Sequence, residues 1–212
     1  PAATIAPPTT INNNTTFTGG VSLKNETPED TDGGRESLIT FKGLQSGQEE
    51  STLAQIQASH DGTSDDEKGD LIFKTNDGSD GASPTERMRI DSDGNLLVGT
   101  TDANPGNNSG GSDVGSVLDI NGKVLATANG AEVMVLNRQS SNGTIADFRQ
   151  DGSQVFSMTS YGASSEFSIG GTGANTSGLY FSSGNQTLPM KANGVSDDTQ
   201  DLGKFNFRWD DV

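Results

Sequence analysis

The sequence has no cysteine and only one histidine among its 212 residues. The absence of cysteine excludes disulfide bonds and thiolate metal sites. No apolar run approaches the length of a membrane-spanning helix, and the amino end lacks the basic start and apolar middle of a secretory signal peptide. The 13 lysine and arginine residues are scattered singly, whereas nucleic-acid binding needs clustered positive charge. We therefore expect neither membrane insertion nor a nucleic-acid partner.

Bulky apolar residues are also scarce. Isoleucine, leucine, valine and phenylalanine account for 41 of the 212 residues, and the formal net charge is −16. A chain of this composition lies at the limit below which too little apolar surface is buried for folding. The 28 glycines add backbone entropy that folding must overcome. The chain is therefore either disordered, or it gains buried surface from other copies of itself.

Turn signals divide the chain into short segments. Ten Asp-Gly or Asn-Gly dipeptides begin at Asp32, Asp61, Asp77, Asp80, Asp93, Asn121, Asn129, Asn142, Asp151 and Asn193. Their glycines supply the positive φ angles that tight hairpin turns require. Between them, apolar and polar residues alternate in LAQIQASH, GDLIFKT, ERMRI, EVMVLNRQ, IADFRQDGSQVFSM and SEFSIGG. Since a disordered chain has no reason to alternate in this way, we predict an all-β fold without significant helix.

An apolar–turn–apolar plan recurs around Asp93, Asn121 and Asp151. Its irregular spacing indicates stacked or intertwined β-hairpins and not a solenoid with a fixed period. Because a single hairpin cannot cover its own apolar face, we expect an elongated oligomeric rod. We divide the chain into an extended linker (1–20), two hairpin modules (21–110 and 111–200) and a terminal junction (201–212).

Two segments resemble a known family. Residues 56–101 resemble a segment of the tail fibres of tailed bacteriophages, many of them marine. In those fibres a strand, an acidic loop, a Lys-Gly-x-Leu-x-Phe strand and a Glu-Arg-Met-Arg-Ile hairpin occur in this order. The matching residues here are Lys68, Gly69, Leu71, Phe73 and 86–90. The carboxyl end, DLGKFNFRWDDV, resembles the junction that precedes the self-cleaving intramolecular chaperone of phage fibres and endosialidases, with matches at Leu202, Gly203, Arg208, Trp209, Asp211 and Val212.

The resemblance implies a homotrimeric, fibrous virion protein of the phage tail, extracellular, whose chaperone assembles three chains and is then released. Its partners would be its own copies, other tail proteins and a host-surface receptor, with a glycan expected. The cleavage residues of the chaperone would lie after Val212, so we assign no catalytic residue and do not expect an enzyme. The alternatives are another virion fibre, a glycan-cleaving tailspike and, more remotely, a bacterial surface adhesin.

Two acidic stretches have the composition of cation sites. The segment 91–95, Asp-Ser-Asp-Gly-Asn, lacks the third acidic position and the distal glutamate of a calcium loop, so we interpret it as a hairpin turn. The densest acidic run comprises Asp61, Asp65, Asp66 and Glu67 beside His60. Because its spacing defines no coordination geometry, we interpret it as a solvated loop between two strands. We therefore predict no metal site and no cofactor.

A glycine-rich stretch and several aromatic residues are further candidates for binding sites. The stretch 170–178, GGTGANTSG, lacks the Gly-Lys-Ser/Thr ending of a phosphate-binding loop, so we predict an ordinary loop. The rings of Tyr161, Tyr180, Phe181 and Trp209 are of a kind that stacks on sugars. For most aromatic residues we expect packing around the fibre axis instead. The alternation supports such packing for Phe148 and Phe156, and Trp209 is expected to pack at the end of the shaft.

Overall fold

The computed structural model describes residues 18–107, 113–161, 166–171, 177–183, 187–191, 194–195, 203–204 and 207–208. Within these residues the protein is built from β-strands, and the helical content is a single 3₁₀ turn, η1 (Pro105–Asn107). The predicted all-β fold is confirmed. The chain divides into two compact units, residues 1–133 and 134–212. Trp209 and residues 1–17 of the expected linker lie outside the described residues.

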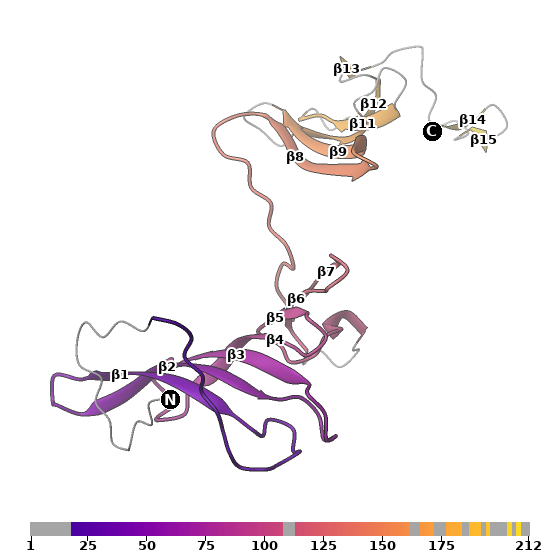
Figure 1. Ribbon diagram of the computed structural model, residues 1–212. Helices are drawn as coiled ribbons and strands as arrows, with labels where there is room; N and C mark the ends of the chain where they lie inside the picture. Colours follow the sequence, from indigo (N-terminus) through magenta and orange to yellow (C-terminus); the bar gives the residue numbers. More distant parts are fainter. Residues whose placement is uncertain are drawn as a thin grey trace. The chain divides into compact units, whose positions relative to one another are not determined.

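The first unit holds one seven-stranded antiparallel sheet whose strands neighbour each other in sequence order (Figure 1). This is the simplest arrangement for strands joined by short turns, and each neighbouring pair is antiparallel. The strands are β1 (Ser37–Leu44), β2 (Glu50–His60), β3 (Gly69–Thr75), β4 (Thr85–Ile90), β5 (Leu96–Val98), β6 (Gly115–Leu118) and β7 (Val124–Thr127).

The second unit holds a six-stranded sheet, in the order β13-β12-β11-β10-β9-β8, and a two-stranded ribbon. The sheet strands are β8 (Gly143–Gln150), β9 (Ser153–Tyr161), β10 (Glu166–Gly170), β11 (Ser177–Phe181), β12 (Thr187–Lys191) and β13 (Gly194–Val195). The ribbon consists of β14 (Gly203–Lys204) and β15 (Phe207–Arg208).

Two expectations differ from the structure. We predicted a strand in EVMVLNRQ, but residues 132–139 belong to no sheet, because no strand in the described residues pairs with them. The predicted modules meet between residues 110 and 111, whereas the compact units meet between Val133 and Met134. The later position follows from strand pairing, since β6 hydrogen-bonds to β5 and β7 to β6.

The register of the first sheet sorts its side chains onto two faces. Directly paired residues project from the same side of a sheet. One row runs Leu71, Ile90, Leu96, Leu118, Val124 across five neighbouring strands. A second row, Ile39, Ile56, Phe73, Met88, Val98, lies on the same side and begins at β1. Together with Phe41, these residues form what we call the apolar face.

The opposite side is the covered face. It carries Ile72, Leu97 and Val117, which are the buried aliphatic residues of this sheet in the described chain. Leu97 and Val117 are fully buried, and so is Pro105 of η1, which contacts β6 and β7. The β5–β6 connection therefore folds over this side and gives the sheet a small core. The core is thin, as the composition predicts.

The second sheet is sorted in the same way. Phe148, Phe156, Met158 and Ile169 lie on one side, where the rings of Phe148 and Phe156 are 4.9 Å apart and those of Phe167 and Phe181 are stacked at 4.4 Å. The other side carries Ser157, Ser168 and Met190, all buried. Phe148 and Phe156 are directly paired across β8 and β9, and their expected packing around a fibre axis stays a prediction.

Candidate functional site

Residues 91–95 form a turn between β4 and β5. Asp91 Oδ1 accepts hydrogen bonds from the backbone N–H groups of Asp93 at 3.1 Å and Asn95 at 2.8 Å, and Oδ2 accepts from the Asn95 side-chain amide at 2.9 Å. Gly94 takes a φ of 88°, which a side chain would disfavour. The carboxylate of Asp91 is thus occupied by the turn itself. The interpretation as a hairpin turn is confirmed.

The same turn recurs between β6 and β7. Asp119 Oδ1 accepts from the Asn121 N–H at 2.6 Å, and the Gly122 N–H donates to the Asp119 carbonyl at 2.8 Å. The two turns are also linked, because the Ile120 N–H donates to Oδ1 of the buried Asn95 at 3.0 Å. A repeated architectural unit explains this acidic motif, with one side-chain amide joining its two copies.

His60 is the centre of the polar cluster that the acidic run forms. Its side chain is buried; Nδ1 lies 3.3 Å from the Thr31 carbonyl oxygen and Nε2 lies 3.1 Å from Asp66 Oδ1. Both neighbours are acceptors, so the neutral ring, with one N–H, satisfies only one of them. The Lys68 backbone N–H, followed by the His60 ring, lowers the pKa of Asp66 below its ordinary value.

Arg35 ties the same cluster to the preceding loop. Its guanidinium donates to the carbonyl oxygens of Glu29 at 2.6 Å and Asp66 at 2.7 Å, and it pairs with Asp30. Sequence reasoning expected the run 61–67 to be a solvated loop, and Asp65 and Glu67 are indeed exposed. The burial of His60 was not predicted from the sequence, because the residues that cover it come from a loop about 30 positions away in the chain.

A second polar cluster lies on the covered face, with Asp70 buried and Arg89 and Glu86 half-buried. Arg89 forms a two-bond contact with Glu86, at 2.7 Å for each bond, and a third bond of 2.5 Å to the buried carboxylate of Asp70. Burial raises the pKa of Asp70, while the charge of Arg89 acts in the opposite direction. A carboxylate held by a guanidinium in this way serves to join β3 to β4. Nothing in the sequence pattern distinguished Asp70 from the exposed acidic residues.

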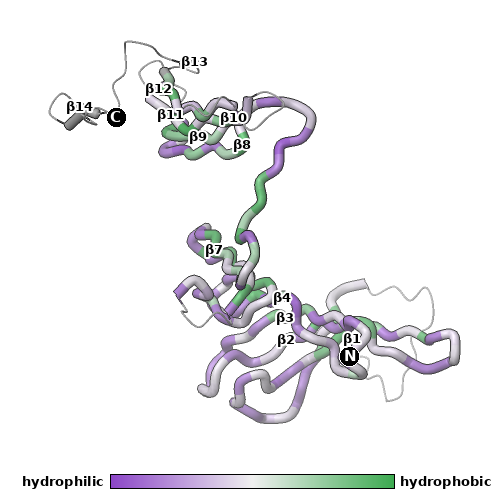
Figure 2. The backbone as a smooth tube through the Cα atoms, turned by 180° about the vertical axis from the view of Figure 1, so that it is seen from behind, coloured by the Kyte–Doolittle hydropathy of each residue, from purple (hydrophilic) through white to green (hydrophobic). Residues whose placement is uncertain are grey.

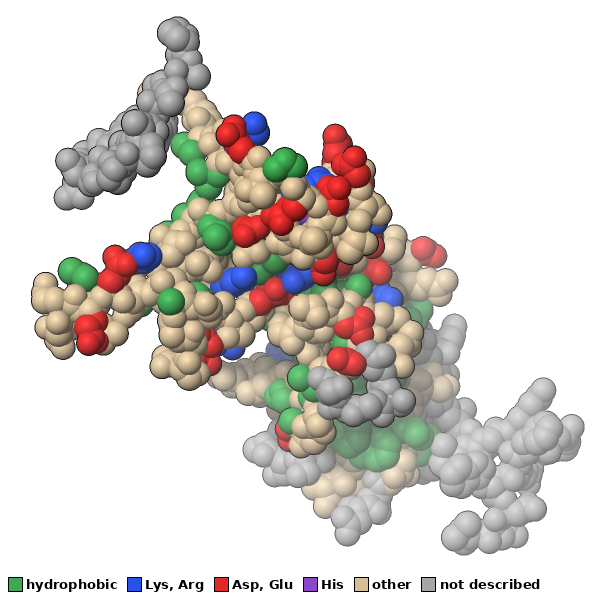
Figure 3. Space-filling view, turned by 90° about the horizontal axis from the view of Figure 1, so that it is seen from below, with side chains coloured by type: hydrophobic (Ala, Val, Ile, Leu, Met, Phe, Trp, Pro, Cys, Tyr) green, Lys and Arg blue, Asp and Glu red, His purple; other side chains and the backbone are tan. Residues whose placement is uncertain are grey.

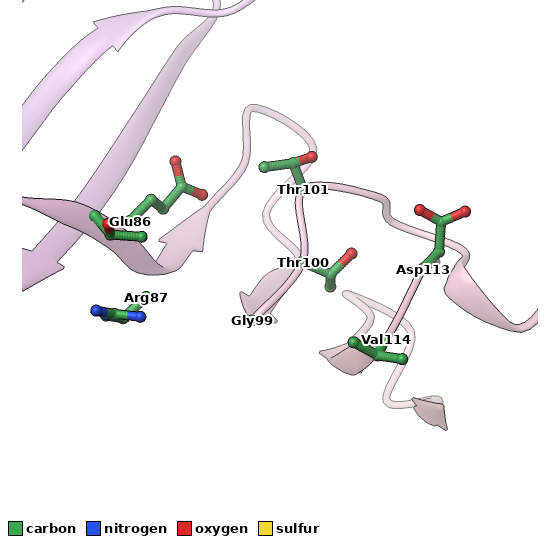
Figure 4. A pocket seen from close by; sticks show the side chains of 8 residues that line it. Glu86, Arg87, Gly99, Thr100, Thr101, Asp113 and Val114 are labelled. Carbon is green, nitrogen blue, oxygen red and sulfur yellow. The ribbon is translucent and has the colours of Figure 1, made fainter. Parts of the chain in front are cut away.

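An open groove of about 440 Å³ lies beside the start of β4 in the first unit (Figure 4). Thr85, Glu86 and Arg87 line one side, and Gly99, Thr100, Thr101, Asp113 and Val114 line the other. Two of its charged groups already have partners: Glu86 binds Arg89, and Arg87 donates to Asp77 at 3.2 Å. The groove presents no aromatic platform and no nucleophile with an adjacent base.

Tyr161 and Tyr180 come together on the polar side of the second sheet, with ring centres 5.6 Å apart in an edge-to-face arrangement. Glu166 accepts a 2.8 Å hydrogen bond from the Ser183 hydroxyl, and this bond together with one from Tyr180 lowers the pKa of Glu166. Phe181 lies instead on the apolar side, stacked on Phe167. The glycine-rich stretch ends in strands at Gly170 and Ser177, and residues 172–176 lie outside the described residues.

The most extensive candidate for an interaction surface is the apolar face. Its side chains retain large exposed fractions, including 48% for Phe41, 50% for Leu118 and 70% for Val124. In the second sheet, Phe148 is 47% exposed and Phe167 is 40% exposed. Contiguous apolar surface of this kind marks a site of association. By contrast, the face of the first unit seen in Figure 3 carries many acidic side chains interspersed with fewer basic ones.

Among the described residues, no group of three or more His, Cys, Asp or Glu side chains is arranged to hold a metal ion. The same residues include no helix of the length and hydrophobicity needed to cross a bilayer. Comparison with known protein families, with curated proteins and with solved structures finds no match to this chain.

Proposed function

We propose that the chain is a segment of a homotrimeric bacteriophage tail fibre that attaches the virion to a host-surface glycan. The observation that carries the proposal is the bare apolar face of a sheet whose small core lies on the other side. The likeness of residues 56–101 and 201–212 to phage tail fibres supplies the family and the number of copies. The fibre role is structural and adhesive, and no residue of the chain acts as a catalyst.

The apolar face is wide enough to require a large partner surface. Seven strands spaced about 4.8 Å apart span about 29 Å. The bare side chains include Ile39, Phe41, Leu71, Ile90, Val98, Leu118 and Val124, each between 39% and 70% exposed. Burying the rest of each contributes about 1 kcal/mol, or about 7 kcal/mol per chain. This gain is comparable to the whole stability of an ordinary domain.

Copies of the same chain are the partners that fit this surface. Each copy necessarily brings an apolar face of equal extent, and a closed symmetric assembly buries every face at once. Charge opposes this association, because each chain carries a formal charge of −16. Salt or divalent cations should therefore strengthen the assembly by screening the repulsion. A chaperone that brings three chains together early would overcome the same repulsion.

Attachment then acts through multivalency. Weak contacts from three chains of one fibre, and from several fibres of one particle, add up to avidity without any single strong site. This accords with the open shape of the groove beside the start of β4, which does not enclose a ligand. A glycan-cleaving tailspike would need a pair of free carboxylates at a defined separation, and of the two carboxylates that line the groove beside the start of β4, Glu86 is held by Arg89.

Antibodies against the purified chain, visualised with gold on intact virions, test the location. Gold on tails, together with inhibition of particle adsorption by the free protein, is expected. Gold on heads would contradict the tail assignment and favour another virion fibre. Incubation of the protein with host capsular polysaccharide is expected to release no reducing ends, and their release would contradict the purely adhesive role.

A further inference from the structure

The segment between β7 and β8 has the chemistry of a strand but has no strand partner. Val133, Met134, Val135 and Leu136 are four successive apolar residues, 55%, 71%, 76% and 48% exposed. They form the continuous hydrophobic stretch in the connection that leads from β7 to β8 in Figure 2. No hydrogen bond joins the backbone of residues 132–137 to another described residue.

Such a segment is unfavourable in water, because its side chains leave apolar area exposed. Its residues are also of a type that favours extended strands. A run that is apolar on both alternating sides is typical of a strand buried on both faces. Residues 132–138 therefore have the sequence of an inner strand but lack its environment in the isolated chain.

The chain offers a free sheet edge of matching length. β8 has eight residues and, within the described structure, pairs on one side only, with β9. The other edges fit less well. β7 has four residues and β13 has two, and the start of β1 is contacted by the segment around Leu23 and Asn25.

The segment does not pair with β8 of its own chain, although the intervening residues 139–142 are long enough for a hairpin loop. The side chain of Arg138 occupies this connection instead. Its guanidinium donates to the Ser141 carbonyl at 3.1 Å, the Ser141 hydroxyl at 3.1 Å and the Thr144 carbonyl at 3.4 Å. The same group lies against Gly143, where an added Cβ would come within 2.9 Å of it.

We propose that residues 132–138 of one copy add as a strand to the β8 edge of a second copy of this chain. The inference rests on the proposed assembly of identical chains. Each copy then donates one strand and offers one edge, so a closed ring leaves neither unused. Charge does not oppose the contact: the donor carries one glutamate and one arginine, and β8 carries one aspartate and one arginine. In a chain of net charge −16, two segments without net charge are suited to meet.

Hydrogen exchange and cross-linking test this proposal on the full chain. In the assembled protein, the amides of residues 133–136 are expected to exchange at least about 100-fold more slowly than in an unstructured peptide. The absence of cysteine makes the cross-link specific. A Val135→Cys chain is co-produced with a differently tagged chain carrying Ile145→Cys, Ala146→Cys or Asp147→Cys, which covers three successive β8 positions.

A disulfide-linked pair that carries both tags is expected for at least one β8 position. No such pair is expected with Ser46→Cys, at the exposed tip of the β1–β2 hairpin. The mass of the same sample separates the two proposals. An assembly whose 133–136 amides exchange rapidly, or whose β8 cysteines never link to position 135, overturns strand donation and leaves the fibre proposal standing. A monomer overturns both.

Discussion

Replacing Asp91 with alanine should destabilise the protein more than the same change at Asp119, although both residues begin the same five-residue turn. Asp91 accepts three hydrogen bonds, two from backbone N–H groups and one from the Asn95 amide. Asp119 accepts one backbone hydrogen bond, and its contact with Lys123 is 3.8 Å long. The Asn95 amide that Asp91 orients is buried, and its oxygen holds the second turn.

Each hydrogen bond contributes about 1 kcal/mol net. The expected loss of stability is therefore about 3 kcal/mol for Asp91→Ala and about 1 kcal/mol for Asp119→Ala. For a chain of this size, these losses lower the melting temperature by about 6–12 °C and about 2–4 °C.

Far-ultraviolet circular dichroism measures both melting temperatures. All samples must share one protomer concentration, because assembly makes the melting temperature depend on concentration. Each scan is repeated with calcium and with a chelator, and the two Asp91→Ala scans are expected to coincide. Equal shifts for the two variants would refute the hydrogen-bond reasoning. A specific calcium stabilisation that Asp91→Ala abolishes and Asp119→Ala preserves would refute the interpretation as a turn.

Three further changes test other parts of the structure. Ile39→Lys should abolish assembly and Thr40→Lys should not, because these neighbouring exposed residues lie on opposite faces of β1. Light scattering measures the mass of both variants, and equal effects would contradict the role of the apolar face. Hydrogen bonds from the Ser79 hydroxyl, the Ser79 N–H and Arg87 lower the pKa of Asp77 from 3.8 to about 2. The ionised Asp77 therefore stabilises the folded protein fully above pH 3.8, and this contribution is lost as the pH falls through about 2. The difference in melting temperature between wild type and Asp77→Asn should accordingly shrink over that range, and a constant difference would contradict it. Gly178→Ala should lower the free energy of unfolding, measured by chemical denaturation, by about 1–3 kcal/mol, because the added Cβ would lie 2.7 Å from the Ile169 carbonyl oxygen. In the control variant Gly47→Ala the added Cβ meets nothing within 4 Å, so its stability should be close to that of the wild type.

Local signals in the sequence predicted local structure well. Nine of the ten Asp-Gly and Asn-Gly glycines are described with positive φ, and the tenth dipeptide begins at Asn193, outside the described residues. Alternation located β2 and β4, where Ala54, Ile56 and Ala58, and Met88 and Ile90, each share one side of the sheet, and it located β3 although Ile72 projects from the opposite side to Leu71 and Phe73. These features depend on a few neighbouring residues, which the sequence displays directly.

Features that depend on distant partners were not predictable in this way. The pattern of residues 132–139 is that of a strand, yet a strand also needs a partner, and no strand of the described residues pairs with this segment. His60 is buried by a loop near Thr31, and Asp70 by its position on the covered face. Neither burial has a local signature. The joining of successive hairpins into one meandering sheet in each unit likewise follows from pairing between strands of neighbouring hairpins.

The mass of the assembled protein tests the central claim most directly. Sedimentation equilibrium of the chain, produced together with the chaperone expected after residue 212, should give three times 22.0 kDa, or about 66 kDa, after the chaperone is released. Dyes that fluoresce on exposed apolar surface should then bind weakly. A stable, folded species of 22.0 kDa would contradict the account, because its sheets would remain folded with their apolar faces in water.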